Sequence, residues 1–295
     1  MNYVCGGINR TPDMSLTAYV NGVFTPLNKA MVSVEDRGFQ FADGVYEVAI
    51  CLGGNFFLLK EHLQRLEKSC QAIQLHLPVT ISELDSLVRE TYHKNTLAEA
   101  LIYIQVTRGS APRSHGFPLH PEPSLIITVR QLPKPDEKKC RLGATAITLA
   151  DIRWRRGDIK SISLLASVMG KQEANNRGVD ETFWLDHKGY VLEGCSTNVF
   201  AVIGDILVTH PLDTQILGGI TRNLILNLAK RNEIKVEERP WRLAEQGISE
   251  CLMSSSSNAI LSVTAIDGKA IGTGKVGPVG KKLRALIIAQ MTYKQ

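Results

Sequence analysis

The segment PKPDEKK, residues 133–139, interrupts the hydrophobic patterns that run along the chain on either side of it. Its two prolines lack a backbone N–H and restrict the chain, and the charged run after them offers no apolar residue to bury. Such a segment is typical of a connection between folded units. It predicts a small N-terminal α/β domain over residues 1–132, an interdomain linker over 133–139 and a larger C-terminal domain over 140–295.

Hairpin and helix patterns alternate on the N-terminal side of this linker. Asn21-Gly22 and Gly53-Gly54 each stand between β-rich runs, and such pairs are typical of two-residue hairpin turns. Apolar residues at helical spacing indicate amphipathic helices, the second of which has Ser82 as its expected cap. The expected helices cover residues 60–73 and 81–95, and further β-rich runs cover residues 100–108 and 124–132.

The C-terminal side of the linker has a different order of elements. The patterns predict a helix over 161–176, a hairpin over 181–193, one strand over 198–209, a helix over 221–232 and a last helix from about Lys281. Hairpins and helices mixed in this way, in two unlike halves, predict an α+β fold class with two domains.

Composition limits the classes of function. The chain has 295 residues, of which 44% are hydrophobic and 21% are charged, as in ordinary globular proteins. The net charge of +5 is spread along the chain, with one basic cluster at Arg153, Arg155, Arg156 and Lys160. This is little support for nucleic-acid binding and fits a site for small anions equally well. We therefore expect no nucleic-acid partner.

The cysteines and the apolar stretches give expectations about compartment. Six cysteines are scattered without a CxxC pair, which predicts reduced thiols in a cytoplasmic protein, and no Cys/His spacing suggests a metal site. The start of the chain, MNYVCGGINRTPDM, lacks the pattern of a signal peptide. The longest apolar runs, such as ALIIA, are too short to span a membrane.

Two side chains are candidates for covalent and acid–base chemistry. Lys160 precedes an apolar-periodic helix and lies close in sequence to Arg155 and Arg156, and a lysine near other cations can act as a nucleophile or base. A solvated surface lysine is the commoner alternative. Glu193 ends an apolar strand, where its carboxylate could contact a basic ring nitrogen or could lie at the edge of a hairpin.

Three features could bind a phosphate. The glycines of ILGGITR precede a helix whose first residues, Ile220 and Thr221, offer free N–H groups and a hydroxyl, although a simple capped turn is an equal alternative. The serine run 254–257 offers more hydroxyls or is a polar turn. Arg65 lies off the apolar stripe of its helix and could face a phosphate or solvent. Together with a lysine and a glutamate, these are the groups that a pyridoxal phosphate site requires.

A further candidate site lies in VTRGSAPRSHGFP, residues 106–118, which we call the Arg-x-His loop. Two prolines and two glycines disfavour a helix or a central strand here. Arg113 and His115 bring a guanidinium and an imidazole together, which predicts an anion site for a nucleic-acid phosphate, a cofactor phosphate or a carboxylate. Arg108, at the end of the preceding strand, is expected to be structural.

The sequence resembles the fold-type IV pyridoxal-phosphate enzymes, the group of D-amino acid transaminases and branched-chain aminotransferases. The resemblance covers about the whole chain, and its motifs occur in family order: EDRGFQFADGVYE, VTRGSAPRSHGFP, DIRWRRGDIKSISLL, KQEA, EGCSTNVF and ILGGITR. It implies that pyridoxal 5′-phosphate lies between the two domains, bound mainly by the C-terminal one. It also implies a homodimer in which the neighbouring subunit completes each site.

The resemblance also implies roles for individual residues. Lys160 would form the internal aldimine with the cofactor, and Glu193 would pair with its pyridine nitrogen. The residues expected to bind the phosphate are Arg65, Ile220, Thr221 and Ser256, and Ser255 is expected to contact the substrate.

The Arg-x-His loop discriminates within this group. Arg113 and His115, with Tyr46 of DGVYE, resemble the carboxylate trap of D-amino acid transaminases. The resemblance therefore implies transamination between a D-amino acid, such as D-alanine, and a 2-oxo acid, such as 2-oxoglutarate. The alternatives of the same fold are a branched-chain L-amino acid aminotransferase, an aminodeoxychorismate lyase and an (R)-amine transaminase. A nucleic-acid-binding protein is an alternative of another class.

Overall fold

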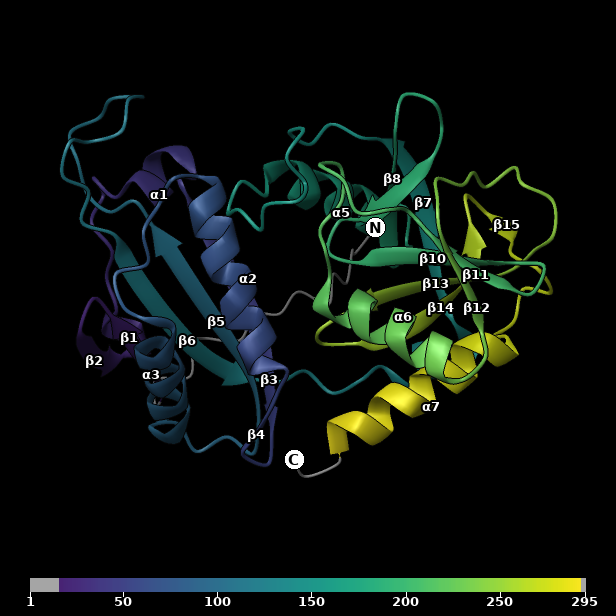
Figure 1. The fold of residues 1–295 in the computed structure, drawn as a ribbon, viewed down its shortest axis with the longest axis horizontal. Coiled ribbons are helices and arrows are strands. Elements are labelled where there is room, and N and C mark those ends of the chain that lie inside the picture. The colour runs from purple at the N-terminus through teal and green to yellow at the C-terminus, as the bar shows by residue number, and fades with distance from the viewer. Residues whose placement is uncertain (1–15, 293–295) are drawn as a thin grey trace, which may run out of the picture.

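The computed structural model describes residues 16–292, so the N-terminal stretch in which we looked for a signal peptide lies outside the described residues, as does Cys5. Two β-sheets with their helices lie side by side and are joined by an extended segment over residues 132–136 (Figure 1). The α+β class predicted from the sequence is confirmed. The exact domain boundaries stay a prediction.

The strands are β1 (Thr17–Val20), β2 (Val23–Pro26), β3 (Gly44–Leu52), β4 (Asn55–Phe57), β5 (Glu99–Thr107), β6 (Ser124–Gln131), β7 (Ala144–Ala150), β8 (Glu181–Leu185), β9 (Val191–Gly194), β10 (Asn198–Ile203), β11 (Ile206–Thr209), β12 (Lys235–Glu238), β13 (Ile248–Ser255), β14 (Ala259–Ile266) and β15 (Lys269–Ala270). The helices are α1 (Arg37–Phe41), α2 (Leu59–Ala72), α3 (Ile81–His93), α4 (Glu137–Leu142), α5 (Leu165–Asn176), α6 (Ile220–Arg231) and α7 (Pro278–Thr292), with a short 3-10 helix η1 (Leu27–Lys29). No helix within residues 16–292 combines the length and the apolar character needed to cross a membrane.

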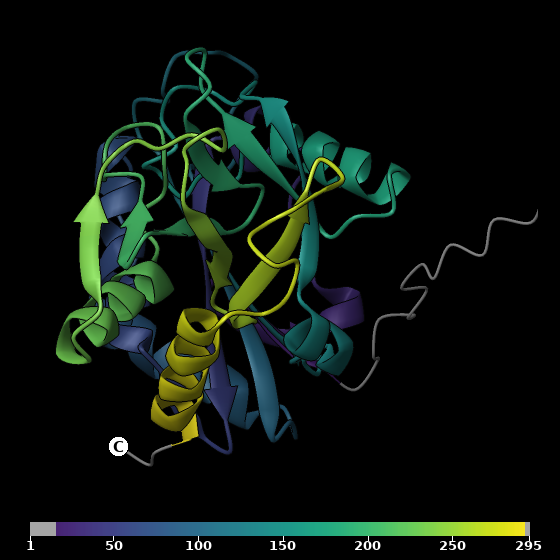
Figure 2. The same cartoon turned by 90° about the vertical axis from the view of Figure 1, so that its right-hand side faces the viewer.

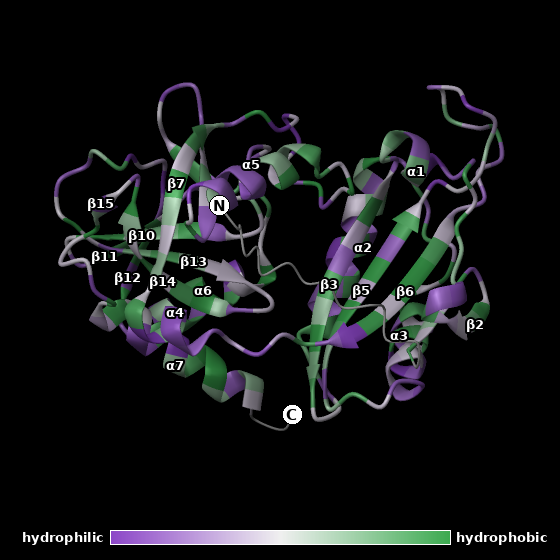
Figure 3. Cartoon of the chain, turned by 180° about the vertical axis from the view of Figure 1, so that it is seen from behind, coloured by the Kyte–Doolittle hydropathy of each residue, from purple (hydrophilic) through white to green (hydrophobic). Residues whose placement is uncertain are grey.

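The N-terminal sheet has the strand order β2-β1-β6-β5-β3-β4 and is antiparallel throughout. Helices α2 and α3 pack on one of its faces, where alternate residues of β5 are buried together with the apolar stripe of α2. Both expected hairpins are confirmed: Asn21 and Gly22 have φ values of 48° and 93°, and Gly53 and Gly54 have 56° and 86°. The opposite face of this sheet, with much of β5 and β6 coloured as hydrophobic, is seen in Figure 3.

The C-terminal sheet curls until it closes on itself. Its path runs β12-β11-β10-β13-β14-β7-β8-β9, and β9 also pairs with β10. This closure covers the β9 edge of the sheet and encloses an apolar interior that includes Phe183, Val199 and Met253. Helices α6 and α7 cover the outside of the ring beside one another, packing on Phe200 and Leu252 (Figure 2).

Several element boundaries differ from those expected. The strand predicted over 198–209 is two strands, because Gly204, with φ of 63°, turns the chain between β10 and β11. Thr80, not Ser82, caps α3, since its hydroxyl and the Glu83 side chain form a reciprocal capping box. The charged end of the predicted linker is helical, because Asp136 caps α4 at Lys139 N–H. Helix α5 begins only at Leu165, and α7 begins before Lys281, at Pro278.

Two pairings place the chemistry-bearing residues at the junction of the two sheets. Asn198 of β10 pairs with Glu193 of β9 where the ring closes. The segment after β7 crosses to the N-terminal sheet, where Ser161 forms an isolated bridge with Val45 and the Tyr46 N–H donates to the Lys160 carbonyl at 2.9 Å. Lys160 is therefore held between β3 and the open end of the ring.

Candidate active site

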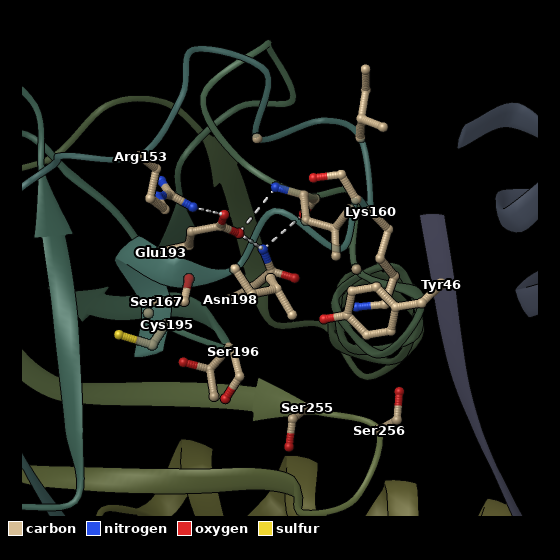
Figure 4. A pocket seen from close by; sticks show the side chains of 18 of the residues that line it. Tyr46, Arg153, Lys160, Ser167, Glu193, Cys195, Ser196, Asn198, Ser255 and Ser256 are labelled. Carbon is tan, nitrogen blue, oxygen red and sulfur yellow. Dashed lines mark hydrogen bonds and ion pairs between the residues drawn. The ribbon is translucent and has the colours of Figure 1, made fainter. Parts of the chain in front are cut away.

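A cleft between the two sheets gathers most of the residues singled out from the sequence (Figure 4). Its walls come from β3, from α2, from the segment 153–167, from the β9–β10 corner, from the start of α6 and from the end of β13. The predicted residues that line it are Tyr46, Arg65, Lys160, Glu193, Ile220, Thr221, Ser255 and Ser256. Residues from both halves of the chain thus meet in one site.

Lys160 extends into this cleft toward Tyr46 (Figure 4). Its Nζ atom lies 4.4 Å from the centre of the Tyr46 ring. Tyr46 also stacks on Tyr103 of β5, with ring centres 5.5 Å apart. The lysine is half-buried and lines the cleft, which favours a role in the site over that of a solvated surface lysine. Arg155 and Arg156, which the sequence analysis placed near it, are exposed and do not line the cleft.

Glu193 lies across the cleft in a buried network of donors. Its Oε2 accepts from Asn198 Nδ2 at 3.1 Å and from the Leu217 N–H at 3.0 Å, and its Oε1 pairs with Arg153. Burial raises the pKa of this carboxyl to about 7, while Arg153, the Leu217 N–H and Lys160 act in the opposite direction. The pKa of the buried Glu193 carboxyl at the cleft wall is therefore close to neutral pH.

Arg153 is a residue that the sequence analysis assigned only to a basic cluster. Its guanidinium makes two bonds of 2.9 Å to Asp151, one of 3.0 Å to the Gln215 carbonyl and the ion pair with Glu193. These partners fix the plane of the guanidinium behind the Glu193 carboxylate (Figure 4). The DIRWRR spacing of an aspartate two residues before an arginine was the available signal for this pair.

Polar donors gather at the opposite end of the cleft. Helix α6 begins there at Ile220, after Gly219, and no side chain among the described residues caps it, so its first N–H groups face the cleft. The hydroxyls of Thr221, Ser255 and Ser256 lie beside them. Ser254, also in this lining, is 3% exposed, and its Oγ has no hydrogen-bond partner among the described residues. A buried donor without a partner at a helix start is suited to an anion.

Arg65 reaches this end of the cleft from α2. Glu47 of β3 accepts from its Nε at 2.5 Å and from its Nη2 at 2.9 Å, and the Gly218 carbonyl accepts from its Nη1 at 3.0 Å. Hydrogen bonds from His62 and Arg65 outweigh burial and lower the pKa of the Glu47 carboxyl to about 2. Glu47 is thus a fixed anion that orients Arg65, and sequence reasoning missed it.

Arg113 and His115 do not line the cleft of their own chain. Both are exposed at the tip of the Arg-x-His loop. Arg113 lies over the ring of Phe41, with its Cζ 4.6 Å from the ring centre, and the His115 ring lies 5.4 Å from the same ring. Arg108 is structural, as expected: it is 2% exposed and pairs with Asp43.

The side chains and N–H groups that line the cleft fit pyridoxal phosphate. One end of the cleft offers N–H groups, hydroxyls and a guanidinium for a phosphate, including the Ser254 hydroxyl, which has no partner within residues 16–292. The other end offers a carboxylate for a ring nitrogen, and an amine lies between the two ends. Among the described residues, no group of three or more His, Cys, Asp or Glu side chains could hold a metal ion.

Comparison with known proteins decides the family. The family model described as amino-transferase class IV matches residues 44–266. The chain belongs to this family. It is 38% identical over 269 residues to a D-alanine aminotransferase of Staphylococcus epidermidis, covering 90% of this chain and 94% of that protein.

Solved structures of class IV aminotransferases share the fold of this one. The branched-chain amino acid aminotransferase of Escherichia coli superposes with a TM-score of 0.87 at 26% identity, covering 94% of this chain and 95% of the other. The T.th. branched-chain amino acid aminotransferase with pyridoxamine 5′-phosphate also gives 0.87, at 25% identity and 94% of both chains. The predicted family, fold type IV and dependence on pyridoxal phosphate are confirmed.

Proposed function

We propose that this class IV aminotransferase transfers the amino group between a D-amino acid, such as D-alanine, and a 2-oxo acid, such as 2-oxoglutarate. The observation that carries the substrate assignment is the identity of 38% with a D-alanine aminotransferase over 90% of the chain. The Arg113-x-His115 pair supports it, since a guanidinium fork and an imidazole suit a carboxylate. The cleft supports the reaction class through Lys160 and Glu193.

Each cleft residue has a defined task in this proposal. When bound, pyridoxal phosphate supplies a covalent attachment for the substrate amine and an electron sink for the carbanion. Lys160 would hold the cofactor through Nζ, and its amine would take the proton from the substrate Cα. Glu193, as an anion, holds a proton on the ring nitrogen. The phosphate is bound by Arg65, the N–H groups of Ile220 and Thr221, and Ser256.

Substrate geometry then selects the enantiomer. Lys160 works from one side of the cleft, so the substrate Cα–H bond must point toward its Nζ atom. Fixing the carboxylate at one end of the site determines which enantiomer meets this condition. We assign the carboxylate to Tyr46, Ser255, Arg113 and His115. A substrate without a carboxylate would leave the cation without its partner, which disfavours plain amines.

We also propose a homodimer in which Arg113 and His115 complete the cleft of the neighbouring subunit. Both residues are exposed and outside their own cleft. Exposed large apolar side chains support such an interface, because they are costly to leave in water. They include Met31 at 82% exposure, Val34 at 72%, Phe39 at 76%, Leu119 at 93% and Leu165 at 72%.

Five free cysteines within the described residues support a reducing, cytoplasmic location, which we propose as well.

An assay of the purified protein with pyridoxal phosphate tests the substrate. D-alanine with 2-oxoglutarate should yield pyruvate, and the visible absorbance of the bound cofactor should shift with D-alanine and not with L-alanine. Lys160→Ala should lower the rate by at least about 100-fold, because the proton carrier at Cα is lost. Conversion of L-leucine or L-valine without conversion of D-alanine would instead identify a branched-chain enzyme, the substrate class of the structural relatives.

A further inference from the structure

The motif EDRGFQFADG, residues 35–44, contributes no side chain to the cleft, yet two of its charged residues are buried. Arg37 is 3% exposed and Asp36 is 1% exposed. Asp36 caps α1 through the Gly38 N–H and accepts from Thr107 and Ser124 hydroxyls at 2.8 and 2.9 Å. These bonds join α1 to the ends of β5 and β6, the two strands that the Arg-x-His loop connects.

Arg37 reaches from this helix to the backbone of the Arg-x-His loop. Its Nη1 donates to the Ser114 carbonyl at 2.6 Å and to the Gly116 carbonyl at 3.2 Å, and its Nη2 donates to the His115 carbonyl at 3.4 Å. One guanidinium therefore binds three consecutive carbonyls directly after Arg113. These bonds tie an exposed loop to a buried guanidinium and so favour one conformation of its backbone.

Asp43 anchors Arg37 to the core. Its Oδ2 accepts from Arg37 Nε at 2.8 Å and from Arg108 Nε at 2.8 Å, and its Oδ1 accepts from Arg108 Nη2 at 3.0 Å. Arg108 is fixed in turn by the carbonyls of Ile73 and Gln74 at the end of α2. Arg37 is therefore tied through Asp43 to Arg108 and to the end of α2.

Phe41 of α1 supports the two side chains at the loop tip. The Arg37 Cζ lies 4.9 Å from the centre of its ring and the Arg113 Cζ lies 4.6 Å from it. The His115 ring lies 5.4 Å away. The same short helix therefore holds the loop backbone through Arg37 and packs against the Arg113 and His115 side chains through Phe41.

We propose that Arg37 is a positioning residue for the substrate carboxylate, which it serves by holding the backbone that carries Arg113 and His115. This proposal rests on the proposed function, in which the Arg113 and His115 side chains bind the carboxylate of a D-amino acid or 2-oxo acid. Arg37 itself touches neither substrate nor cofactor. It sets the geometry of a bidentate contact, and a misplacement of about 1 Å at such a contact can cost on the order of 100-fold.

Replacement of Arg37 by lysine or glutamine tests the proposal. Lysine keeps the charge but offers no planar fork for three carbonyls, and glutamine removes the charge as well. Asp43 keeps its bonds to Arg108 in both variants, so no buried carboxylate is left unpaired. KM for D-alanine and for 2-oxoglutarate should rise about 10-fold or more, with kcat changed by less than about threefold.

Binding without turnover gives a second measurement. D-lactate has the carboxylate of D-alanine and no amino group to react, so its Kd for the holoenzyme should rise by the same factor. The visible absorbance of the bound cofactor and the dimer mass should stay as in the unaltered enzyme. Arg89→Lys is the matched control, because Arg89 also pairs with a carboxylate and lies over an aromatic ring, but contacts no carbonyl of the Arg-x-His loop.

The Arg113→Ala background separates positioning from a general structural effect. If Arg37 acts through Arg113, the double variant Arg37→Lys, Arg113→Ala should have nearly the KM of Arg113→Ala alone. Equal losses in both backgrounds, or unchanged KM and Kd values in an enzyme that converts D-alanine, would overturn the positioning role. An unaltered enzyme that does not convert D-alanine would overturn the substrate assignment, and this proposal with it.

Discussion

Glu193 shows, at the scale of one residue, how function opposes stability. It is 6% exposed, and burial raises the pKa of its carboxyl to about 7, whereas its proposed task requires the anion. Arg153, the Leu217 N–H and Lys160 favour the anion. Asn198 donates to the same oxygen as Leu217. The network therefore holds a charge that folding alone would exclude.

The pH dependence of stability should expose this opposition. The pKa of the Glu193 carboxyl is about 7 in the folded state, whereas its ordinary value is 4.5. Ionisation of this group therefore lowers the free energy of unfolding as pH rises from about 4.5 to 7, and the loss stays constant at higher pH. Glutamine does not ionise. The free energy of unfolding of cofactor-free Glu193→Gln should therefore improve relative to the unaltered protein by roughly 2 kcal/mol between pH 5 and 8.

Thermal or urea unfolding of both proteins at several pH values measures this difference. Glu173→Gln is a suitable control, because the Glu173 side chain is 35% exposed and its ion pair within residues 16–292 is with Arg177, one helical turn away. Its stability difference should stay nearly constant with pH. If the stability difference between Glu193→Gln and the unaltered protein is equally independent of pH, the buried carboxyl has its ordinary pKa in the folded state.

At the scale of elements, the start of α6 offers two adjacent glycines with different surroundings. A Cβ atom at Gly219 would lie 2.0 Å from the Asn198 side-chain oxygen, and Asn198 donates to Glu193 and to the Leu217 carbonyl. A Cβ atom at Gly218 would meet only Leu212, at 3.7 Å. The close approach of Gly219 to β10 packs the helix start against Asn198, whose side chain binds Glu193.

Gly219→Ala should therefore damage cofactor binding and Gly218→Ala should not. The first substitution must displace Asn198 or the helix start, at a cost of about 1–3 kcal/mol in stability, and should raise the Kd for pyridoxal phosphate about 10-fold or more. Gly218→Ala should change the Kd by less than about threefold and the stability by less than about 0.5 kcal/mol. Absorbance titration of cofactor-free protein measures Kd. Equal effects of the two substitutions would contradict this reading of the helix start.

Local patterns predicted elements best where one short segment decides the outcome. The Asn21-Gly22 turn and the apolar stripe of α2 depend on residues close in sequence, and both were predicted. The cap of α3 was misplaced because Thr80 and Ser82 are both good caps, and only the reciprocal bond to Glu83 favours Thr80. The turn at Gly204 was missed because apolar residues flank it on both sides.

At the scale of the whole molecule, the site depends on contacts between distant parts of the chain. Lys160, Glu193 and the start of α6 were predicted from motifs, and they meet because the ring closes between β9 and β10. The bond from Tyr46 N–H to the Lys160 carbonyl joins the two sheets, and no local pattern encodes it. Glu47 and Arg37 escaped prediction for the same reason, since their partners lie far along the chain.

The Arg-x-His loop is the part of the proposed site that lies outside the cleft of its own chain. Arg113 and His115 are exposed, and so are Phe39 of α1 and Leu119, at 76% and 93%. A two-fold axis would bury such a surface twice and could carry each loop to the cleft of the other subunit. In this arrangement each site takes residues from both subunits, whereas in the alternative each site takes all its residues from one subunit.

Mixing two inactive variants tests whether the sites are shared. Lys160→Ala lacks the reacting amine and Arg113→Ala lacks the carboxylate partner, so each homodimer should turn over D-alanine poorly. After random subunit exchange, a mixed dimer has one cleft with Lys160 from one subunit and Arg113 from the other. Activity should recover to about a quarter of that of the unaltered enzyme. If both residues serve the cleft of their own subunit, every cleft keeps one defect and mixing should restore nothing.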